Sequence, residues 1–225
     1  MRYAVFGGGQ RVRPLLSLRI ARVLDSETPA VLRAASCAEL VHCASLIVDD
    51  LPCMDDSPTR RGLPATHVQF GESTAILAAF SLVALAARST AALPRFQRNL
   101  LGVLDPGSLI RGQALDLESP APARSALITE LKTVPLFELA VEAGGVSSSQ
   151  YDRREQELRR FARAFGLAFQ MVDDYLDRDT EDPEPALDQL ARARNAADEL
   201  GPRGHHLLEL VNYLDVKLSE DRSHR

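Results

Sequence analysis

Residues 40–56 read LVHCASLIVDDLPCMDD, a long apolar helical pattern that ends in a cluster of carboxylates. Residues 166–177, GLAFQMVDDYLD, have the same form and end in Asp173, Asp174 and Asp177. On a helix, Asp173 and Asp177 stand at i and i+4 and project from the same face. Carboxylates that directly follow apolar segments are partly buried, and buried negative charge needs a cation to offset it. Because Mg²⁺ shares carboxylate and phosphate oxygens, the two clusters predict a site that holds Mg²⁺ and a diphosphate.

Composition indicates one soluble, cytoplasmic domain. The chain has 225 residues and is 45% hydrophobic, enough for one substantial core. A net charge of −5 and 5% aromatic residues argue against a nucleic-acid surface. The three cysteines form no CxxC pair, which favours a reduced compartment. No signal peptide is expected, and the longest apolar run, residues 75–87, falls short of the roughly 18 residues of a membrane span.

Hydrophobic periodicity predicts an all-α chain. Apolar residues recur at helical spacing, and no stretch alternates in the manner of a strand. Thr28-Pro29 is typical of a helix start, and residues 91–106 are predicted to be a connector. Helices are expected at residues 15–24, 29–49, 72–88, 107–117, 125–144, 149–175, 186–200 and 203–219.

Basic groups complement the acidic clusters. Arg11 and Arg13 follow a glycine turn at residues 7–9, and Arg60 and Arg61 follow the first cluster. The arginine guanidinium can donate two parallel hydrogen bonds to phosphate oxygens, and a glycine turn exposes backbone N–H groups to an anion. Each group alone is a weak signal, because most charged residues are solvated. Their order around two metal-type clusters is what favours a diphosphate site.

The motifs together resemble those of the trans isoprenyl diphosphate synthases, or polyprenyl synthetases, and are most similar to bacterial geranylgeranyl and farnesyl diphosphate synthases. Residues 7–14, GGGQRVRP, resemble the family's opening Gly-Gly-Lys-x-x-Arg-Pro signature. Residues 40–67 are similar to its first aspartate motif with a trailing Arg-Arg-Gly-x-Pro-x-x-His. GQALDL at 112–117, KT at 132–133 and residues 166–177 match the remaining motifs in order.

The resemblance implies a single domain over residues 1–225: a helical bundle of the isoprenoid synthase type around a central apolar cavity. It also implies a Mg²⁺-dependent transferase that condenses isopentenyl diphosphate with an allylic diphosphate. The implied cofactor is three Mg²⁺ ions bound with the substrate, which neutralise charge on the departing pyrophosphate. Mn²⁺ would satisfy the same oxygens.

Site roles follow from the resemblance by position. The implied metal ligands, or their immediate support, are Asp49, Asp50, Asp55, Asp173 and Asp177. The implied contacts of the allylic diphosphate are Arg60, Lys132, Thr133 and Gln170. The implied isopentenyl diphosphate site comprises Gln10, Arg13, Arg61 and His67. Supporting positions are Gln113, Asp116 and Asp174. His67 also fits a buried structural histidine, and Asp56 a solvated neighbour of the cluster.

Product length in the resembled family depends on residues just before the first aspartates. Ala44 and Ser45 occupy those positions here. Small side chains leave room for a longer product, so the C15–C20 range is expected and C20 geranylgeranyl diphosphate is favoured.

Several positions depart from the family pattern. Gln10 replaces a lysine, Val48 replaces a histidine, and Phe80 stands in the place of an aspartate. The leading helices and a lysine-bearing segment after Asp177 are expected to be missing. An alternative is therefore a degenerate, non-catalytic subunit that modulates an intact homologue. A terpene cyclase on the same scaffold is a third hypothesis. A homodimer, or a heterodimer with a homologous synthase, is expected because unpaired apolar faces seek a partner.

Overall fold

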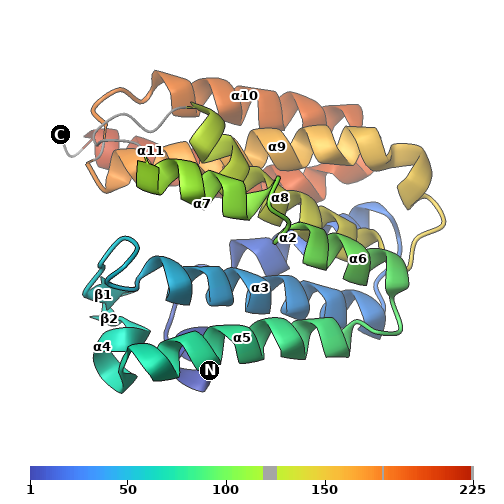
Figure 1. Ribbon diagram of the computed structural model, residues 1–225. Coiled ribbons are helices and arrows are strands. Elements are labelled where there is room, and N and C mark those ends of the chain that lie inside the picture. Colours follow the sequence, from blue (N-terminus) through green and yellow to red (C-terminus); the bar gives the residue numbers. More distant parts are fainter. Residues whose placement is uncertain (119–125, 179, 224–225) are drawn as a thin grey trace.

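The computed structural model describes residues 1–118, 126–178 and 180–223 and shows the predicted all-α architecture (Figure 1). Within these residues a minimal β-hairpin interrupts the helices. The elements are α1 (Arg2–Phe6), α2 (Val12–Val23), α3 (Pro29–Asp49), β1 (Thr59–Arg60), β2 (Leu63–Pro64), α4 (Thr66–Phe70), α5 (Glu72–Ser89), α6 (Pro94–Gly102), α7 (Leu109–Glu118), α8 (Ala126–Gly145), α9 (Tyr151–Leu176), α10 (Glu184–Glu199), the 3₁₀ helix η1 (Gly201–Gly204) and α11 (His205–Ser223).

Local sequence signals explain where the long helix α3 begins and ends. Thr28 is its N-cap, and the Thr28 side chain accepts a hydrogen bond from the Val31 N–H at 3.4 Å. Pro29 stands at the first helical position, where its missing N–H costs no hydrogen bond. The helix ends at Asp49, just before Leu51-Pro52, so the first aspartate cluster lies at its C-terminal end.

The helices stack in layers. From one side of the molecule to the other, α5 packs on α3, α3 on α8, α8 on α9, and α9 on α10, with α2 and α7 also against α8 (Figure 1). The C-terminal ends of α3 and α9 carry the two aspartate clusters. Because α8 lies between these two helices, it separates the clusters and contributes side chains to both.

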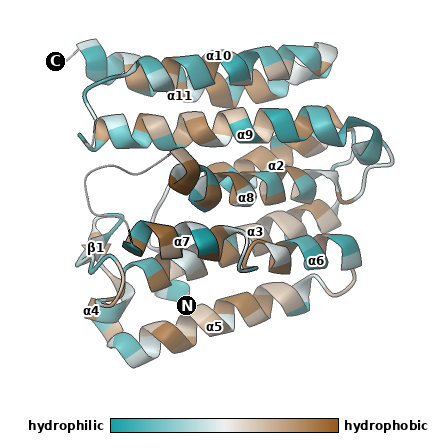
Figure 2. Cartoon of the chain, turned by 45° about the horizontal axis from the view of Figure 1, so that its top comes forward, coloured by the Kyte–Doolittle hydropathy of each residue, from teal (hydrophilic) through white to brown (hydrophobic). Residues whose placement is uncertain are grey.

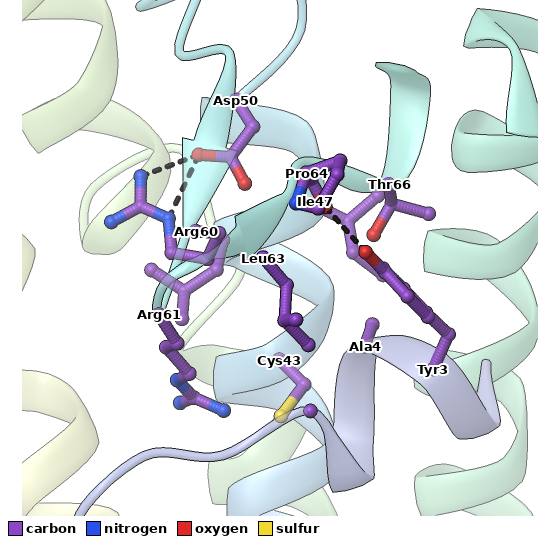
Figure 3. Close-up of a pocket in the computed structure, with 12 residues that line it drawn as sticks. Tyr3, Ala4, Cys43, Ile47, Asp50, Arg60, Arg61, Leu63, Pro64 and Thr66 are labelled. Carbon is purple, nitrogen blue, oxygen red and sulfur yellow. Dashed lines mark hydrogen bonds and ion pairs between the residues drawn. The ribbon is translucent and has the colours of Figure 1, made fainter. Parts of the chain in front are cut away.

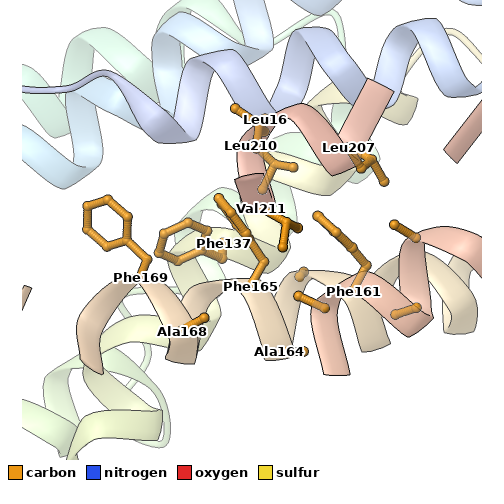
Figure 4. Packing of buried hydrophobic residues seen from close by; sticks show 14 of the residues in the cluster. Leu16, Phe137, Phe161, Ala164, Phe165, Ala168, Phe169, Leu207, Leu210 and Val211 are labelled. Carbon is orange, nitrogen blue, oxygen red and sulfur yellow. The ribbon is translucent and has the colours of Figure 1, made fainter. Parts of the chain in front are cut away.

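An aromatic cluster fixes the approach of α8 and α9. The Phe137 and Phe165 rings pack edge to face at 5.7 Å, and the Phe161 and Phe165 rings stack at 5.5 Å (Figure 4). All three side chains are fully buried. Gly166 faces Phe137, where a Cβ would lie 2.8 Å from the ring, so glycine permits this close contact. The packing of α8 on α9 therefore positions Thr133 beside Gln170 of α9, while the charge of Lys132 acts on Asp49 of the first cluster.

The structure corrects three expectations about local structure. Residues 91–106 are not merely a connector, because they contain α6. Only Phe96 and Leu100 of α6 are buried, which explains why its periodicity is hard to recognise. The hairpin β1–β2 and the short helix α4 were likewise not predicted, since each is too short to show a hydrophobic period.

Two helices are longer than the apolar run at residues 75–87. Helices α3 and α5 have 21 and 18 residues and are apolar enough to cross a membrane by length and composition. A core helix meets the same criterion, and 56% of the α3 window is buried inside the protein. The α5 window is 28% buried and leaves Leu77 and Phe80 exposed. Figure 2 shows hydrophobic colouring along much of α5. Helix α5 therefore has an apolar face that the described part of the chain leaves uncovered.

Candidate active site

A polar pocket of about 390 Å³ lies between the glycine turn and the end of α9. Its lining includes four arginines and the three carboxylates of the second aspartate cluster. The arginines are Arg11, Arg13, Arg60 and Arg61, and the carboxylates are those of Asp173, Asp174 and Asp177. The structure thus brings together the predicted glycine turn, the Arg-Arg pair and the second aspartate motif from distant parts of the chain.

The glycine turn is shaped around an arginine. Gly8 and Gly9 both have φ of +102°, a conformation that favours glycine. A Cβ on Gly9 would lie 2.6 Å from the Arg61 guanidinium, so a larger residue would displace that side chain. Arg61 Nη1 also donates a hydrogen bond of 3.0 Å to the Gly8 carbonyl. The turn therefore holds one of the predicted phosphate-binding arginines in the pocket.

Asp49 and Asp173 are the carboxylates most strongly perturbed by their surroundings. Burial raises the pKa of Asp49 to about 6, and Lys132 partly opposes this rise. Burial likewise raises the pKa of Asp173 to about 6, against the opposing charge of Lys217. These carboxylates are hard oxygen donors whose buried charge is incompletely compensated by the protein, which fits a divalent cation.

No protein-only metal cage is present in the described part of the chain: no three His, Cys, Asp or Glu side chains converge closely enough there. Mg²⁺ usually binds one or two carboxylates and completes its shell with water and substrate phosphates. The donor set therefore fits Mg²⁺ that arrives with a diphosphate. Asp55 and Asp177, both exposed, flank the two clusters on the solvent side.

Asp50 is buried and paired with an arginine. Its carboxylate is 2% exposed and accepts a hydrogen bond from Arg60 Nε at 2.9 Å, with Arg60 Nη2 on the same oxygen (Figure 3). This ion pair and its hydrogen bonds with Asp50 raise the pKa of Arg60 despite partial burial. Asp50 therefore orients the Arg60 guanidinium, and a role for Asp50 as a metal ligand or as support for one stays a prediction.

Three helices supply a connected group of polar side chains around α8. Lys132 Nζ lies 2.6 Å from Asp116 Oδ2 on α7, and Gln113 of α7 reaches Asp55 at 3.5 Å. On the other side, Gln170 donates a hydrogen bond of 2.8 Å to Asp174. The structure therefore brings the predicted allylic-diphosphate residues of α8 and α9 together with their predicted supporting residues.

Thr133 connects α8 directly to α9. Its hydroxyl lies 3.5 Å from Gln170 Oε1, and its side chain is buried. The preceding residue, Lys132, acts on Asp49 of the first cluster, whereas Thr133 contacts Gln170 on the helix that carries the second cluster.

Sequence reasoning missed His42 and Glu39, two residues of α3 that line the polar pocket. His42 Nε2 lies 3.2 Å from Arg13 Nη1, and its Nδ1 is buried without a hydrogen-bond partner in the described structure. Burial and the nearby arginines hold the pKa of His42 well below its usual range, so the ring is neutral. The available signal was spacing, because His42 lies two helical turns before Asp49 on the same helix.

Glu39 balances the arginines. Its buried carboxylate accepts a hydrogen bond from Arg11 Nη1 at 2.5 Å and lies 3.8 Å from Arg61 Nη2. Arg13, by contrast, is held over the ring of Phe137 at 4.5 Å, and burial lowers its pKa to about 10. Its Nε is buried without a partner in the described part of the chain, which leaves hydrogen-bonding capacity for a ligand.

The two remaining predicted isopentenyl diphosphate residues, His67 and Gln10, differ in their position relative to the polar pocket. His67 lies on α4 and does not line the polar pocket. Its predicted contact with substrate therefore has no support in this geometry. Gln10 does line the pocket, and its Oε1 accepts a hydrogen bond of 3.2 Å from the Tyr213 hydroxyl on α11.

An apolar cavity of about 780 Å³ adjoins the first aspartate cluster. Asp49 lies on its wall, and Ala44 and Ser45 line it one to two turns earlier on α3. The Ser45 hydroxyl donates to the His42 carbonyl at 2.9 Å, which satisfies its hydrogen-bonding need. Val48 and Phe80, which depart from the family pattern, also line this cavity. Phe80 is 69% exposed, so the wall formed by α5 is partly open.

Comparison with known proteins agrees with this geometry. Residues 1–185 match the family model described as Polyprenyl synthetase. Geranylgeranyl pyrophosphate synthase 4 of Arabidopsis thaliana is 39% identical over 191 residues, which cover 79% of this chain and 51% of the relative. The heterodimeric geranylgeranyl pyrophosphate synthase large subunit 2 of the same plant is 36% identical over 209 residues, covering 85% and 56%. The chain thus spans little more than half the length of these two relatives.

Solved structures match over more of their length. An FPP/GFPP synthase from Zymomonas mobilis superposes with a TM-score of 0.84 at 30% identity, covering 94% of this chain and 85% of that one. The matched family model includes both aspartate clusters, the glycine turn and the Arg-Arg pair. On the agreement of sequence motifs, fold and family model, this chain belongs to the polyprenyl synthetase family.

Proposed function

We propose that the chain is a short-chain prenyltransferase that joins isopentenyl diphosphate to an allylic diphosphate in a Mg²⁺-dependent reaction. The observation that carries this proposal is the position of Asp49, which lies on the wall of the 780 Å³ apolar cavity and feels the charges of Lys132 and Asp55. A diphosphate held at this end places its hydrocarbon chain in the cavity. Such a site suits an amphiphilic substrate with one charged end.

The residues divide into two diphosphate-binding groups. Lys132, Thr133 and Gln170 hold the allylic diphosphate, and Arg60 is turned toward it by Asp50. Asp49 and Asp173, with Asp55 and Asp177 at the rim, are the carboxylates that would hold three Mg²⁺ ions. Bound Mg²⁺ supplies electrostatic stabilisation of the negative charge on the departing pyrophosphate.

Arg13, Arg61 and His42 hold the second diphosphate, that of isopentenyl diphosphate. The missing hydrogen-bond partners of Arg13 Nε and His42 Nδ1 leave donors and acceptors for this ligand. The carbon–oxygen bond of the allylic substrate breaks as pyrophosphate leaves with the bonding electrons. The double bond of isopentenyl diphosphate then forms the new carbon–carbon bond, and loss of a proton from the adjacent carbon restores a double bond.

The product is expected to be C15–C20, with C20 geranylgeranyl diphosphate favoured. Ala44 and Ser45 support this expectation, since neither side chain fills the cavity that it lines. Residues 1–225 would act as one domain in the cytoplasm.

Product analysis tests the proposal directly. Purified protein is incubated with isopentenyl diphosphate, each allylic diphosphate and Mg²⁺, with Asp173→Asn as the control. A C15 or C20 diphosphate that the control does not form supports the proposal. A cyclised hydrocarbon would indicate a terpene cyclase instead. No product from folded protein with any allylic substrate would refute the catalytic proposal.

A non-catalytic partner subunit is the second candidate. It is favoured by the uncovered apolar face of α5, where Leu77 and Phe80 are 66% and 69% exposed. A face of this kind would pair with a second copy of the chain or with a homologous synthase. Size-exclusion chromatography with light scattering, alone and with a full-length homologue, distinguishes the two assemblies. A change in the homologue's products on mixing would support the subunit role.

A further inference from the structure

Lysine is used at only two positions in this chain. Of the 26 lysines and arginines, the lysines are Lys132 and Lys217, and the rest are arginine. Among charged side chains, Lys132 has the largest effect on the pKa of Asp49, and Lys217 has the largest effect on the pKa of Asp173. Each of the two aspartate clusters is therefore acted on by the charge of one lysine.

Lys217 is not among the residues that line the polar pocket, but it lies on the last helix, which packs against two of the helices that border that pocket. It lies on α11, which packs against both α2 and α9. Its ammonium group is 5.4 Å from the centre of the Tyr213 ring, one turn earlier on the same face. The Tyr213 hydroxyl in turn donates to Gln10 Oε1, which lines the pocket beside the arginines.

Lys217 is not held in an ion pair within the described residues, although its charge favours the ionised form of Asp173 and so opposes the rise in the pKa of that carboxyl. Lys132 forms an ion pair with Asp116, but Lys217 forms none with the described residues. A lysine ammonium is a compact charge on a flexible stem with three donors, so it can turn toward an anion that enters the pocket. The neighbouring arginines have less freedom, because Arg11 and Arg61 are held by Glu39.

We propose that Lys217 binds the diphosphate of isopentenyl diphosphate, with Tyr213 holding it beside Gln10. The inference rests on the proposed prenyltransferase function. Gln10 contributes an uncharged amide to a pocket otherwise rich in arginine, and Lys217 adds a cation at the same edge. The last helix, outside the matched family region of residues 1–185, thereby becomes part of the substrate site.

The test measures binding apart from turnover. Isopentenyl diphosphate is titrated into the metal-free protein by isothermal calorimetry, without an allylic substrate, so that no reaction occurs. Lys217→Gln is expected to weaken binding about 10-fold through loss of a charge-assisted contact. Lys217→Arg is expected to retain most of the affinity. In the Lys217→Gln protein, Gln10→Lys should recover affinity, because it returns a cation to the same edge.

Arg160→Gln is the matched control for loss of one positive charge. Arg160 is exposed, pairs with Glu199 at 3.0 Å, and lies on α9 about 20 Å along the helix from Asp173. At that separation its effect on the pocket is screened by salt. Its affinity for isopentenyl diphosphate should match that of the unmodified protein, and circular dichroism melting checks that each variant is folded.

The outcomes separate this inference from the proposed function. Unchanged affinity in Lys217→Gln overturns the role of Lys217, even if the protein is an active prenyltransferase. Weakened binding in a protein that forms no product supports Lys217 and refutes the catalytic proposal. In steady-state assays, a raised KM for isopentenyl diphosphate with the allylic KM unchanged supports the assignment. A raised KM for the allylic substrate alone overturns it.

Discussion

Replacement of Ala44 by phenylalanine should shorten the product. Ala44 is 3% exposed and lies on the wall of the apolar cavity, between one and two helical turns from Asp49. The growing hydrocarbon chain is proposed to enter the cavity past this position. A phenyl ring here has about the bulk of one five-carbon isoprene unit, so it would occupy the space that the last unit of the product needs.

The expected size of the effect follows from the apolar character of the cavity. Burial of one isoprene unit stabilises the bound chain by about 4 kcal/mol, at about 0.8 kcal/mol per buried carbon group. Loss of this burial corresponds to about three orders of magnitude in preference for the last elongation step. A C20 product should therefore give way to C15 or shorter. Overpacking costs about 1–3 kcal/mol of stability, which the bundle should tolerate.

Liquid chromatography with mass spectrometry of the dephosphorylated products measures the shift. Ala78→Phe is the matched control, because Ala78 is also buried, on α5, but does not line the cavity. It should lower the melting temperature and leave the product length unchanged. An unchanged product distribution in folded Ala44→Phe, or an equal shortening in Ala78→Phe, would refute the assignment of the cavity to the hydrocarbon chain.

Three further predictions concern the aspartate clusters and the core. Because the pKa values of Asp49 and Asp173 are raised, the native state binds more protons than the unfolded state between about pH 4 and 6. The free energy of unfolding of the metal-free protein should therefore fall as pH rises through this window. Asp49→Asn should remove about 1–3 kcal/mol of that decline, measured by urea unfolding at several pH values, whereas an identical profile would contradict the burial argument. Arg60→Gln leaves the buried Asp50 carboxylate without its partner, so it should lower the free energy of unfolding by about 3 kcal/mol. It should also raise the KM for the allylic diphosphate. The absence of both effects would show that the ion pair is dispensable. Phe165→Ala should destabilise the protein by about 3–5 kcal/mol in chemical unfolding, and a loss below about 1 kcal/mol would mean that the aromatic cluster does not fix α8 against α9.

Elements with a strong local period were predictable from the chain. The capped start of α3 at Thr28-Pro29 and the long pattern of α9 each depend on neighbouring residues, and both helices were observed near the expected bounds. Helix α6 was missed because two buried side chains give too little period to recognise. The hairpin β1–β2 was missed because two-residue strands carry no alternation.

Side-chain direction at the site was less predictable. Asp49 and Asp50 are adjacent and equally acidic in sequence, yet one lies on the apolar cavity and the other is buried against Arg60. His67 matched a motif but lies outside the polar pocket, while His42 lies inside it. Lys217 gave no local signal at all, because its neighbour Asp173 lies on another helix.

By itself, the sequence determined that this chain forms a helical bundle with two aspartate clusters at helix ends, because helical period, capping and motif spacing are local properties of the chain. Only the tertiary structure decided which carboxylate pairs with an arginine, which histidine enters the pocket, and that the last helix brings a lysine to the second cluster. These choices depend on how α2, α3, α9 and α11 pack together, and the contacts that result join residues up to 203 positions apart, as between Gln10 and Tyr213.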